Sequence, residues 1–279
     1  MHTMWNRKDF KDLVSPPAIG MVHLLPLPGS PGWLGDLGAV EAAALSDAAA
    51  LREGGISALM VENYHDVPFH KQQVPPETVA AMTRIIAAIR AAEPRLKLGV
   101  NVLRNDPSAA LGIAVATGAS FVRVNVHVGA SVTDQGTIEG QAWRTLRLRR
   151  ELGAEYVGIL ADVRVKHARP LVERPIGEEA QDLRLRGLAD AVIVTGAATG
   201  SAADPRELAL VREALPECPV LVGSGVTTQN VGQIMGVADG CIVGTSLKVP
   251  DRASRRSVVS TEKTRNFLQE LAAAGAKGN

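Results

Sequence analysis

The sequence predicts a single-domain α/β protein, a (β/α)8 TIM barrel, and three observations lead to this prediction. Short, almost wholly apolar runs recur along the chain, and each is followed by a segment with apolar residues at helical spacing. Eight such pairs are present, which is the number that closes a barrel. The length of 279 residues also suits a fold that typically takes roughly 250 residues.

The apolar runs are the predicted strands. Because both faces of each run are apolar, we expect a parallel sheet covered on both sides, not the alternating pattern of a half-exposed sheet. In chain order the runs occupy residues 19–24, 56–62, 98–103, 121–126, 157–162, 191–195, 220–223 and 241–244.

The predicted helices follow the strands, and several begin with residues suited to a helix N-terminus. Asp106-Pro107 and Asp204-Pro205 each place a capping carboxylate before a proline in the first turn. Gly118 stands where a helix must end before the next strand. The helices are expected at residues 40–53, 75–92, 107–117, 138–151, 178–186, 205–215, 229–235 and 261–274.

Composition and length set the expected organisation of the chain. We expect residues 1–17 to form a polar N-terminal leader, residues 18–274 the barrel and residues 275–279 a C-terminal tail. The formal net charge of +1 provides no field for a nucleic-acid partner. No apolar run reaches the roughly 18 residues of a membrane span and no secretory signal is evident, so we expect no integral membrane segment and a cytoplasmic location. Cys218 and Cys241 match no metal or redox motif and are expected to be reduced core residues.

Two glycine-containing loops at the ends of the last two predicted strands form the sharpest local signal. In phosphate-binding barrels the loops after strands seven and eight hold the anion through backbone N–H groups. An alternative interpretation is that both loops are only tight turns. The expected phosphate-binding residues are Gly223, Ser224, Gly225, Gly244, Thr245 and Ser246.

Polar residues gather at the expected C-terminal ends of the first five strands, where a barrel of this type carries its active site. With a strand period of two, Arg123 and Asn125 share one face, which we expect to line the barrel mouth. The candidate catalytic residues are Glu62, Asn101, Arg123, Asn125, Asp162 and Lys166.

The roles of these candidates stay open at the level of sequence. Glu62 and Asp162 suit acid/base or metal-binding work, or ion pairs with neighbouring arginines in a structural polar layer. Lys166 suits an imine-forming or acid/base role, or an ordinary loop position outside the barrel. No cofactor motif is evident, and no metal ligand is assigned. A divalent metal is left open by the His and Asp residues of segment 65–70, whose spacing matches no rigid template.

Several blocks of the chain resemble the BtpA/SgcQ family. These blocks include Met21-Val22-His23-Leu24, Val61-Glu62-Asn63-Tyr64, Gly223-Ser224-Gly225-Val226-Thr227 and Gly244-Thr245-Ser246-Leu247-Lys248. The resemblance covers about residues 17 to 250. It implies a barrel fold and a divided functional record, because the cyanobacterial namesake is associated with photosystem I accumulation whereas the SgcQ branch accompanies genes for sugar uptake and metabolism.

These observations support two hypotheses of different kinds. The first is an enzyme acting on a small phosphorylated metabolite, a sugar phosphate or related compound, by lyase, isomerase or hydrolase chemistry. The alternative is a non-catalytic assembly or stability factor for photosystem I, as the namesake of the family suggests. We also expect a homo-oligomer, because the long loops after the first two strands carry the apolar residues Trp33, Tyr64, Pro68 and Phe69.

Overall fold

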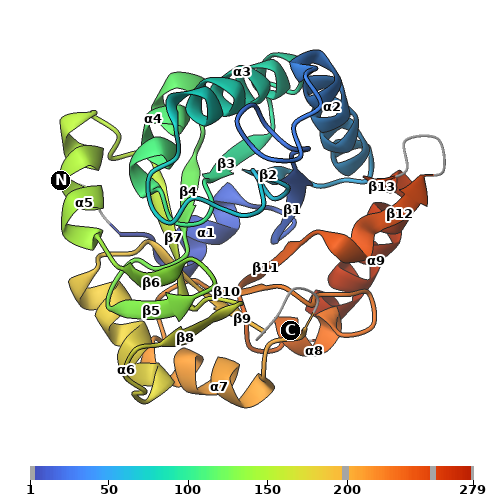
Figure 1. Cartoon of the computed structure of the whole chain (residues 1–279). Helices are drawn as coiled ribbons and strands as arrows, with labels where there is room; N and C mark the ends of the chain where they lie inside the picture. Colours follow the sequence, from blue (N-terminus) through green and yellow to red (C-terminus); the bar gives the residue numbers. More distant parts are fainter. Residues whose placement is uncertain (1–3, 197–200, 252–255, 278–279) are drawn as a thin grey trace.

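The computed structural model describes residues 4–196, 201–251 and 256–277, and it confirms the predicted barrel. Eight parallel strands close in the order β1-β11-β10-β9-β7-β4-β3-β2 (Figure 1). Each predicted apolar run overlaps one of them, so the predicted parallel barrel is confirmed. The barrel strands are β1 (Ala18–His23), β2 (Ala58–Glu62), β3 (Lys97–Asn101), β4 (Phe121–Val124), β7 (Gly158–Arg164), β9 (Ala191–Thr195), β10 (Val220–Gly223) and β11 (Gly240–Val243).

Helices surround the barrel, and the two N-terminal caps that the sequence indicates, Asp106 and Asp204, are both present. The side chains of Asp36, Asp106 and Asp204 each accept a hydrogen bond from a first-turn backbone N–H, which satisfies a donor that has no partner within the helix. In the described part of the chain, no helix has both the length and the apolar character of a membrane span. The surrounding helices are α2 (Leu37–Glu53), α3 (Pro76–Ala92), α4 (Pro107–Thr117), α5 (Ala142–Glu151), α6 (Ile176–Gln181) with a π-helical turn (Asp182–Arg186), α7 (Pro205–Ala214), α8 (Val231–Met235) and α9 (Thr261–Lys277).

A further helix, α1 (Arg7–Leu13), lies within the predicted leader and behind the strands in Figure 1. Asn6 caps it with a capping box, since its side chain accepts from the backbone of Lys8 and Asp9. Phe10 is fully buried and packs with the inward-facing side chains of the barrel strands. A Cβ placed on Gly240 would lie 2.7 Å from the Phe10 ring, so α1 fits directly against the start of β11. The N-terminal end of the barrel is therefore filled by this helix.

The predicted helix at 138–151 was wrong in its first residues. Residues Gly136–Glu139 form β6, which pairs with β5 (Ala130–Thr133), and β5 also pairs with β8 (Ala168–Pro170). Ile138 does face a core, as its apolar character suggested, but that core is a small satellite cluster with Val126 and Val165. A buried apolar residue at the edge of a helical pattern does not distinguish a strand from a helix.

A second addition to the expected barrel is an antiparallel hairpin that follows β11 and a short 3-10 turn (Thr245–Leu247). It consists of β12 (Lys248–Asp251) and β13 (Arg256–Val259). The hairpin projects from the barrel at one side in Figure 1. α9 then begins at Thr261 and continues into the predicted C-terminal tail, of which residues 278–279 lie outside the described residues.

We expect Phe10→Ala to destabilise the fold by about 3 kcal/mol or more, because it removes a large side chain from a fully buried site and leaves a cavity. Lys11→Ala is the matched control, since Lys11 is exposed on the same helix. Urea unfolding followed by circular dichroism gives both free energies. Equal losses for the two variants would show that α1 does not support the barrel.

Candidate functional site

The inside of the barrel changes from apolar to polar at one level along the strands. The inward-facing residues Met60, Phe121 and Leu160 belong to the apolar interior. Two residues further along the same strands stand Glu62, Arg123 and Asp162, and all three are buried. Because alternate residues of a strand face the same side, these polar groups continue the interior column toward the C-terminal ends of the strands. The sequence prediction of a polar barrel mouth is consistent with this arrangement.

The centre of the polar level is an ion pair between Arg123 and Asp162. The guanidinium Nη2 lies 3.0 Å from Asp162 Oδ1 and 3.2 Å from Oδ2, and Asn125 Nδ2 donates to Oδ2 at 2.6 Å. Burial lowers the pKa of Arg123, but the charges of Asp162 and Glu62 together outweigh that effect and raise the pKa above its ordinary value. Arg123 therefore stays charged, and Asp162 is held by two donors from the neighbouring strand.

Glu62 has a different environment. Asn101 Nδ2 donates to Glu62 Oε2, in register with the pairing of these residues between β2 and β3. Within the described residues, no Lys or Arg nitrogen lies within 4.0 Å of the Glu62 carboxylate. Glu62 is thus oriented by an amide and not neutralised by an ion pair, unlike Asp162.

A cavity of about 220 Å³, here called the loop cavity, joins the polar level to the two predicted phosphate loops. Gly223, the sixth predicted phosphate-binding residue, does not line it; it is the last residue of β10, and a Cβ there would lie 2.9 Å from Ile193. Three predicted catalytic residues therefore share one cavity with five predicted phosphate-binding residues. The lining residues include Glu62, Arg123, Lys166, Ser224, Gly225, Gly244, Thr245 and Ser246.

The backbone of the two loops offers unused hydrogen-bond donors. Among the described residues, no acceptor bonds the backbone N–H groups of Ser224, Gly225, Gly244, Thr245 and Ser246. Ser224 and Gly225 both have positive φ, at 76° and 64°, so the chain turns sharply there, and successive N–H groups in turns can form a concave anion site. Gly225 also approaches the chain closely, since a Cβ there would lie 2.3 Å from the carbonyl oxygen of Ser201.

Side chains fix these loops to each other without using those donors. Asn230 Nδ2 donates to the carbonyl of Gly225 at 2.8 Å, and the backbone N–H of Thr227 donates to Asn230 Oδ1 at 2.8 Å. Ser246 Oγ donates to the carbonyl of Val226 at 2.7 Å, which ties the loop after β11 to the loop after β10. The amide donors are therefore held in a preformed arrangement.

Lys166 lies at the cavity and is half-buried, in contrast to the alternative of an ordinary lysine outside the barrel. Its Nζ lies 5.6 Å from the centroid of the Tyr64 ring. Burial lowers the pKa of Lys166, and the nearby Glu62 carboxylate opposes that shift. Lys166 lies just after β7, whose register is irregular between Asp162 and Arg164, so strand periodicity does not predict where its side chain points.

His23 and Lys248 complete this side of the site. The His23 ring stacks on Tyr64 at 4.3 Å between centroids, with 21° between the ring planes. Burial, followed by the positive charges of Lys248 and Lys166, lowers the pKa of His23 well below its ordinary value. The neutral imidazole therefore accepts from Lys248, whose Nζ lies 3.2 Å from His23 Nδ1.

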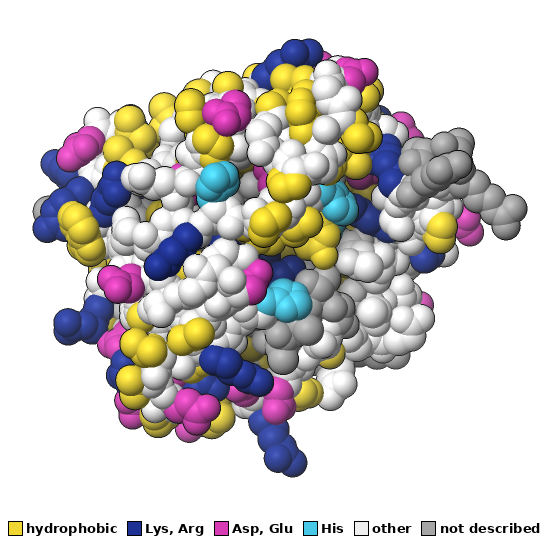
Figure 2. Space-filling model, viewed as in Figure 1, with side chains coloured by type: hydrophobic (Ala, Val, Ile, Leu, Met, Phe, Trp, Pro, Cys, Tyr) yellow, Lys and Arg dark blue, Asp and Glu magenta, His cyan; other side chains and the backbone are white. Residues whose placement is uncertain are grey.

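A second cavity of about 530 Å³, here called the outer cavity, adjoins the first, because Lys166 lines both. Its walls are mainly apolar or aromatic, with one buried cation, Arg104. Figure 2 shows hydrophobic and histidine side chains gathered around a hollow near the middle of this face. The lining residues are Tyr64, His65, Val67, Phe69, Leu103, Arg104, Asp134, Lys166 and His167.

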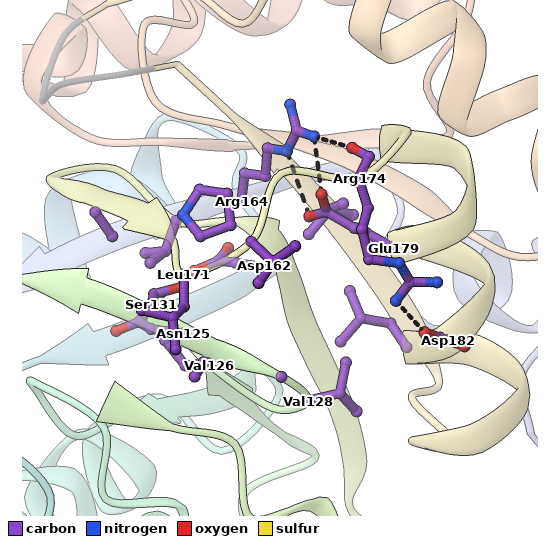
Figure 3. A pocket seen from close by; sticks show the side chains of 18 of the residues that line it. Asn125, Val126, Val128, Ser131, Asp162, Arg164, Leu171, Arg174, Glu179 and Asp182 are labelled. Atoms are coloured by element: carbon purple, nitrogen blue, oxygen red, sulfur yellow. Dashed lines mark hydrogen bonds and ion pairs between the residues drawn. The ribbon is translucent and has the colours of Figure 1, made fainter. Parts of the chain in front are cut away.

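Asn125 and Asp162 border a third cavity, of about 500 Å³, between β8 and α6 (Figure 3). The charged side chains of this cavity are paired with one another: Arg164 with Glu179 at 2.8 Å, and Arg174 with Asp182 at 2.6 Å. Because these charges are compensated within the protein, the third cavity offers a ligand less than the loop cavity does. Of the six predicted catalytic residues, Glu62, Arg123 and Lys166 thus line the loop cavity and Asn101 binds Glu62. Asn125 and Asp162 line the third cavity.

Asp66, one of the residues considered for a metal, has structural partners. Asp66 accepts from the backbone of Leu27 at 2.8 Å and from Asn63 Nδ2 at 3.1 Å, which joins the loops after β1 and β2. Over the described residues, no group of three or more His, Cys, Asp or Glu side chains is placed to hold a metal ion. Both cysteines are free and buried, and burial raises the pKa of Cys218 to about 11 and that of Cys241 to about 12.

Tyr64 and Arg104 belong to this site although they are absent from the predicted catalytic set. Each lies just beyond a predicted strand, Tyr64 two residues after Glu62 and Arg104 directly after the run 98–103. Their position after a strand was the only signal in the sequence that they could belong to the site. The direction of a side chain beyond the end of a strand depends on loop geometry, which the sequence pattern does not specify.

Fold and site together define a TIM-barrel protein whose C-terminal face carries adjoining polar and apolar cavities. The sequence profile of the BtpA family matches residues 14–273, and the chain belongs to this family. It is 49% identical over 234 residues to "Photosystem I biogenesis protein BtpA" of Synechocystis, covering 83% of this chain and 80% of that one. It is 48% identical to an uncharacterized protein of Thermococcus kodakarensis, covering 92% and 96% of the two chains.

Solved structures of low sequence identity share the barrel fold. N-(5'-phosphoribosyl)anthranilate isomerase from Pyrococcus furiosus has a TM-score of 0.55 at 16% identity, covering 92% of this chain and 98% of that one. The tryptophan synthase α subunit from Legionella pneumophila has a TM-score of 0.60 at 14% identity, covering 96% and 97%. At such identities the likeness concerns the fold alone.

Glu62→Gln should lower the pKa of Lys166 further, because it removes the carboxylate that favours the charged ammonium. Reductive methylation with a ¹³C label followed by NMR titration measures this pKa directly. Asp12→Asn, on α1 at the opposite end of the barrel, is the control and should leave the Lys166 titration unchanged. An unchanged Lys166 titration in Glu62→Gln would show that the two side chains do not interact.

Proposed function

We propose that the protein is an enzyme that acts on a small phosphorylated metabolite, a sugar phosphate or related compound, in the cytoplasm. One observation carries the proposal: five loop residues after β10 and β11, whose backbone N–H groups have no acceptor among the described residues, line the same cavity as Glu62, Arg123 and Lys166. The loops bind the phosphate, and the reacting carbon atoms lie over the three side chains. Anchoring one end of a substrate orients the remainder for reaction.

Backbone donors suit phosphate because they supply several hydrogen bonds from a fixed framework, and the loop residues Ser224 and Gly225 line the loop cavity with positive φ. Phosphate sites after strands seven and eight recur among barrels of this type. The isomerase from Pyrococcus furiosus is named for a phosphoribosyl compound, which supports a phosphate compound as the ligand class for this chain as well.

Lys166 and Glu62 fit proton transfer at the substrate. A lysine with a lowered pKa exchanges protons near neutral pH more readily than a surface lysine, and the Glu62 carboxylate lies close enough to affect it. Arg123 is held by Asp162, so it presents a fixed positive charge to the oxygen atoms of the substrate. Isomerase or lyase chemistry beside a phosphate group uses these functions.

The role in photosystem I named for the Synechocystis relative is the second candidate, and the 49% identity favours it. Relatives of 40% to 48% identity occur in several archaea, and one of 35% in Caenorhabditis elegans, all organisms that do not photosynthesise. A function shared by all these relatives can therefore be metabolite chemistry but not photosystem assembly. Loss of photosystem I with unchanged metabolite pools in a deletion strain would favour the second candidate.

Self-association stays a prediction, although most of the apolar loop residues that suggested it have contacts within one chain. Tyr64 stacks on His23, Phe69 lines the outer cavity and Trp33 packs against the core, so these apolar residues have partners within one chain. Light scattering at micromolar concentration should still show a species larger than the 29.4 kDa monomer. A monomer alone would contradict it.

Gly225→Ala should weaken the binding of inorganic phosphate about tenfold or more. The new Cβ would meet the backbone at Ser201 and cannot adopt the local φ without strain, so the amide donors lose their arrangement. Lys248→Ala should have the smaller effect, since Lys248 bonds His23. Isothermal titration gives the three affinities.

Gly232→Ala is the matched control, because its Cβ meets only Ala274 at 3.7 Å and it lies within α8. Wild-type affinity for phosphate in Gly225→Ala would contradict the site. A metabolite library screened by thermal shift then identifies the substrate class, since a ligand that binds only the folded state raises the melting temperature. Equal stabilisation by unphosphorylated analogues would overturn the proposal.

A further inference from the structure

We propose that Arg104 binds a carboxylate of the substrate in the outer cavity, so that the substrate is a phosphorylated carboxylic acid with an apolar or planar part next to the carboxylate. This inference rests on the proposed function for the phosphate half of the substrate. It adds a second anchoring point, on the other side of Lys166 from the phosphate loops.

Arg104 lacks the counter-charge that the other buried arginines have. It is only 4% exposed, yet no carboxylate lies within 4.0 Å of its guanidinium among the described residues. In contrast, Arg123 pairs with Asp162 at 3.0 Å and Arg149 with Asp190 at 2.9 Å. An arginine withdrawn from water without an anion is unfavourable, so a site of this kind fits an anion supplied by a ligand.

Most donors of Arg104 are free to bind such an anion. Its Nη2 donates to the carbonyl oxygen of Lys166 at 2.6 Å, and a guanidinium carries five N–H donors in all. Among the described residues, no nitrogen of Arg104 is both fully buried and unpaired, so its remaining N–H groups keep some exposure, and the residue lines the outer cavity.

The chain around Arg104 is clamped on both sides, which fixes where the guanidinium points. The Leu103 N–H donates to Asn63 Oδ1 at 2.7 Å, and the Arg104 N–H donates to the carbonyl of His70 at 3.0 Å. Asn105 exchanges two hydrogen bonds of 2.9 Å with the backbone of Val126. Such preorganisation lowers the entropy lost on binding a ligand.

The lining of the outer cavity selects the kind of anion. A planar guanidinium matches a carboxylate through two parallel hydrogen bonds. Phe69 and Leu103 lie beside Arg104 in the wall, and Val67 is left 56% exposed, so an apolar or ring-shaped group fits between them. Burial lowers the pKa of Arg104, and the more distant charges of Asp162 and of the exposed Asp134, which also lines the cavity, only partly oppose this effect. A monoanionic carboxylate is easier to transfer to such a wall than a second phosphate.

The test uses benzoate and benzamide as probes, because they share a ring and differ in charge, together with inorganic phosphate. For the wild type, NMR titration should give benzoate about tenfold tighter binding than benzamide, the size expected of a hydrogen bond to a charged group. Arg104→Gln should abolish that preference and leave phosphate affinity unchanged. Arg84→Gln, which removes an exposed partner of Glu41, should change neither.

Equal binding of benzoate and benzamide to the wild type, or an undiminished preference in Arg104→Gln, would overturn the carboxylate site. Tighter binding of phenyl phosphate than of benzoate that depends on Arg104 would overturn it in favour of a second phosphate site. If melting shows that Arg104→Gln is unfolded, Arg104→Lys decides, since it should retain the charge but lose most of the preference. A normal benzoate result with phosphate binding unaffected by Gly225→Ala would refute the proposed function and leave the Arg104 site standing.

Discussion

The buried pair of Arg123 and Asp162 is the interaction on which the rest of the site depends. It places one positive and one negative charge next to the apolar interior of the barrel, and Asn125 supplies Asp162 with a further donor. If one partner were removed, the other would be left as an uncompensated buried charge, which typically destabilises a protein by about 3–5 kcal/mol. The pair also separates two cavities, because Arg123 lines the loop cavity and Asp162 lines the third cavity.

Burying charged side chains at one end of the barrel is unfavourable, so apolar packing at the other end has to offset it. α1 meets this need, because Phe10 packs against the inward-facing side chains and closes the N-terminal end. Gly99 makes a related contribution, since a Cβ there would lie 2.0 Å from the ring of Phe121, which fills the centre of the barrel. Stability is thus concentrated on the face opposite the loops, as is general for this fold, and the C-terminal face is left to the ligand cavities.

Strand periodicity explains which parts of the site could be predicted. Both faces of the strands are apolar until Glu62, Arg123 and Asp162, and a period of two places these residues in the mouth without any knowledge of the loops. The same period does not predict the position of the Lys166 side chain, because the register shift in β7 interrupts it. The β6-β5-β8 sheet was missed for a similar reason. Ile138 is buried by contacts with Val126 and Val165, and both of these residues lie far from it in the sequence. Long-range packing of this kind leaves no local pattern.

Pairing distinguishes structural charges from charges available to a ligand. Arg149, Arg164 and Arg174 each have carboxylate partners, and such arginines hold elements of the barrel together. The backbone N–H groups around Ser224 and the guanidinium of Arg104 lack comparable partners within the described structure. They lie on either side of Lys166, which lines both cavities. A substrate that satisfied both sets of donors would therefore extend across Lys166, and the two anchors would hold its central atoms at the side chain best suited to transfer a proton.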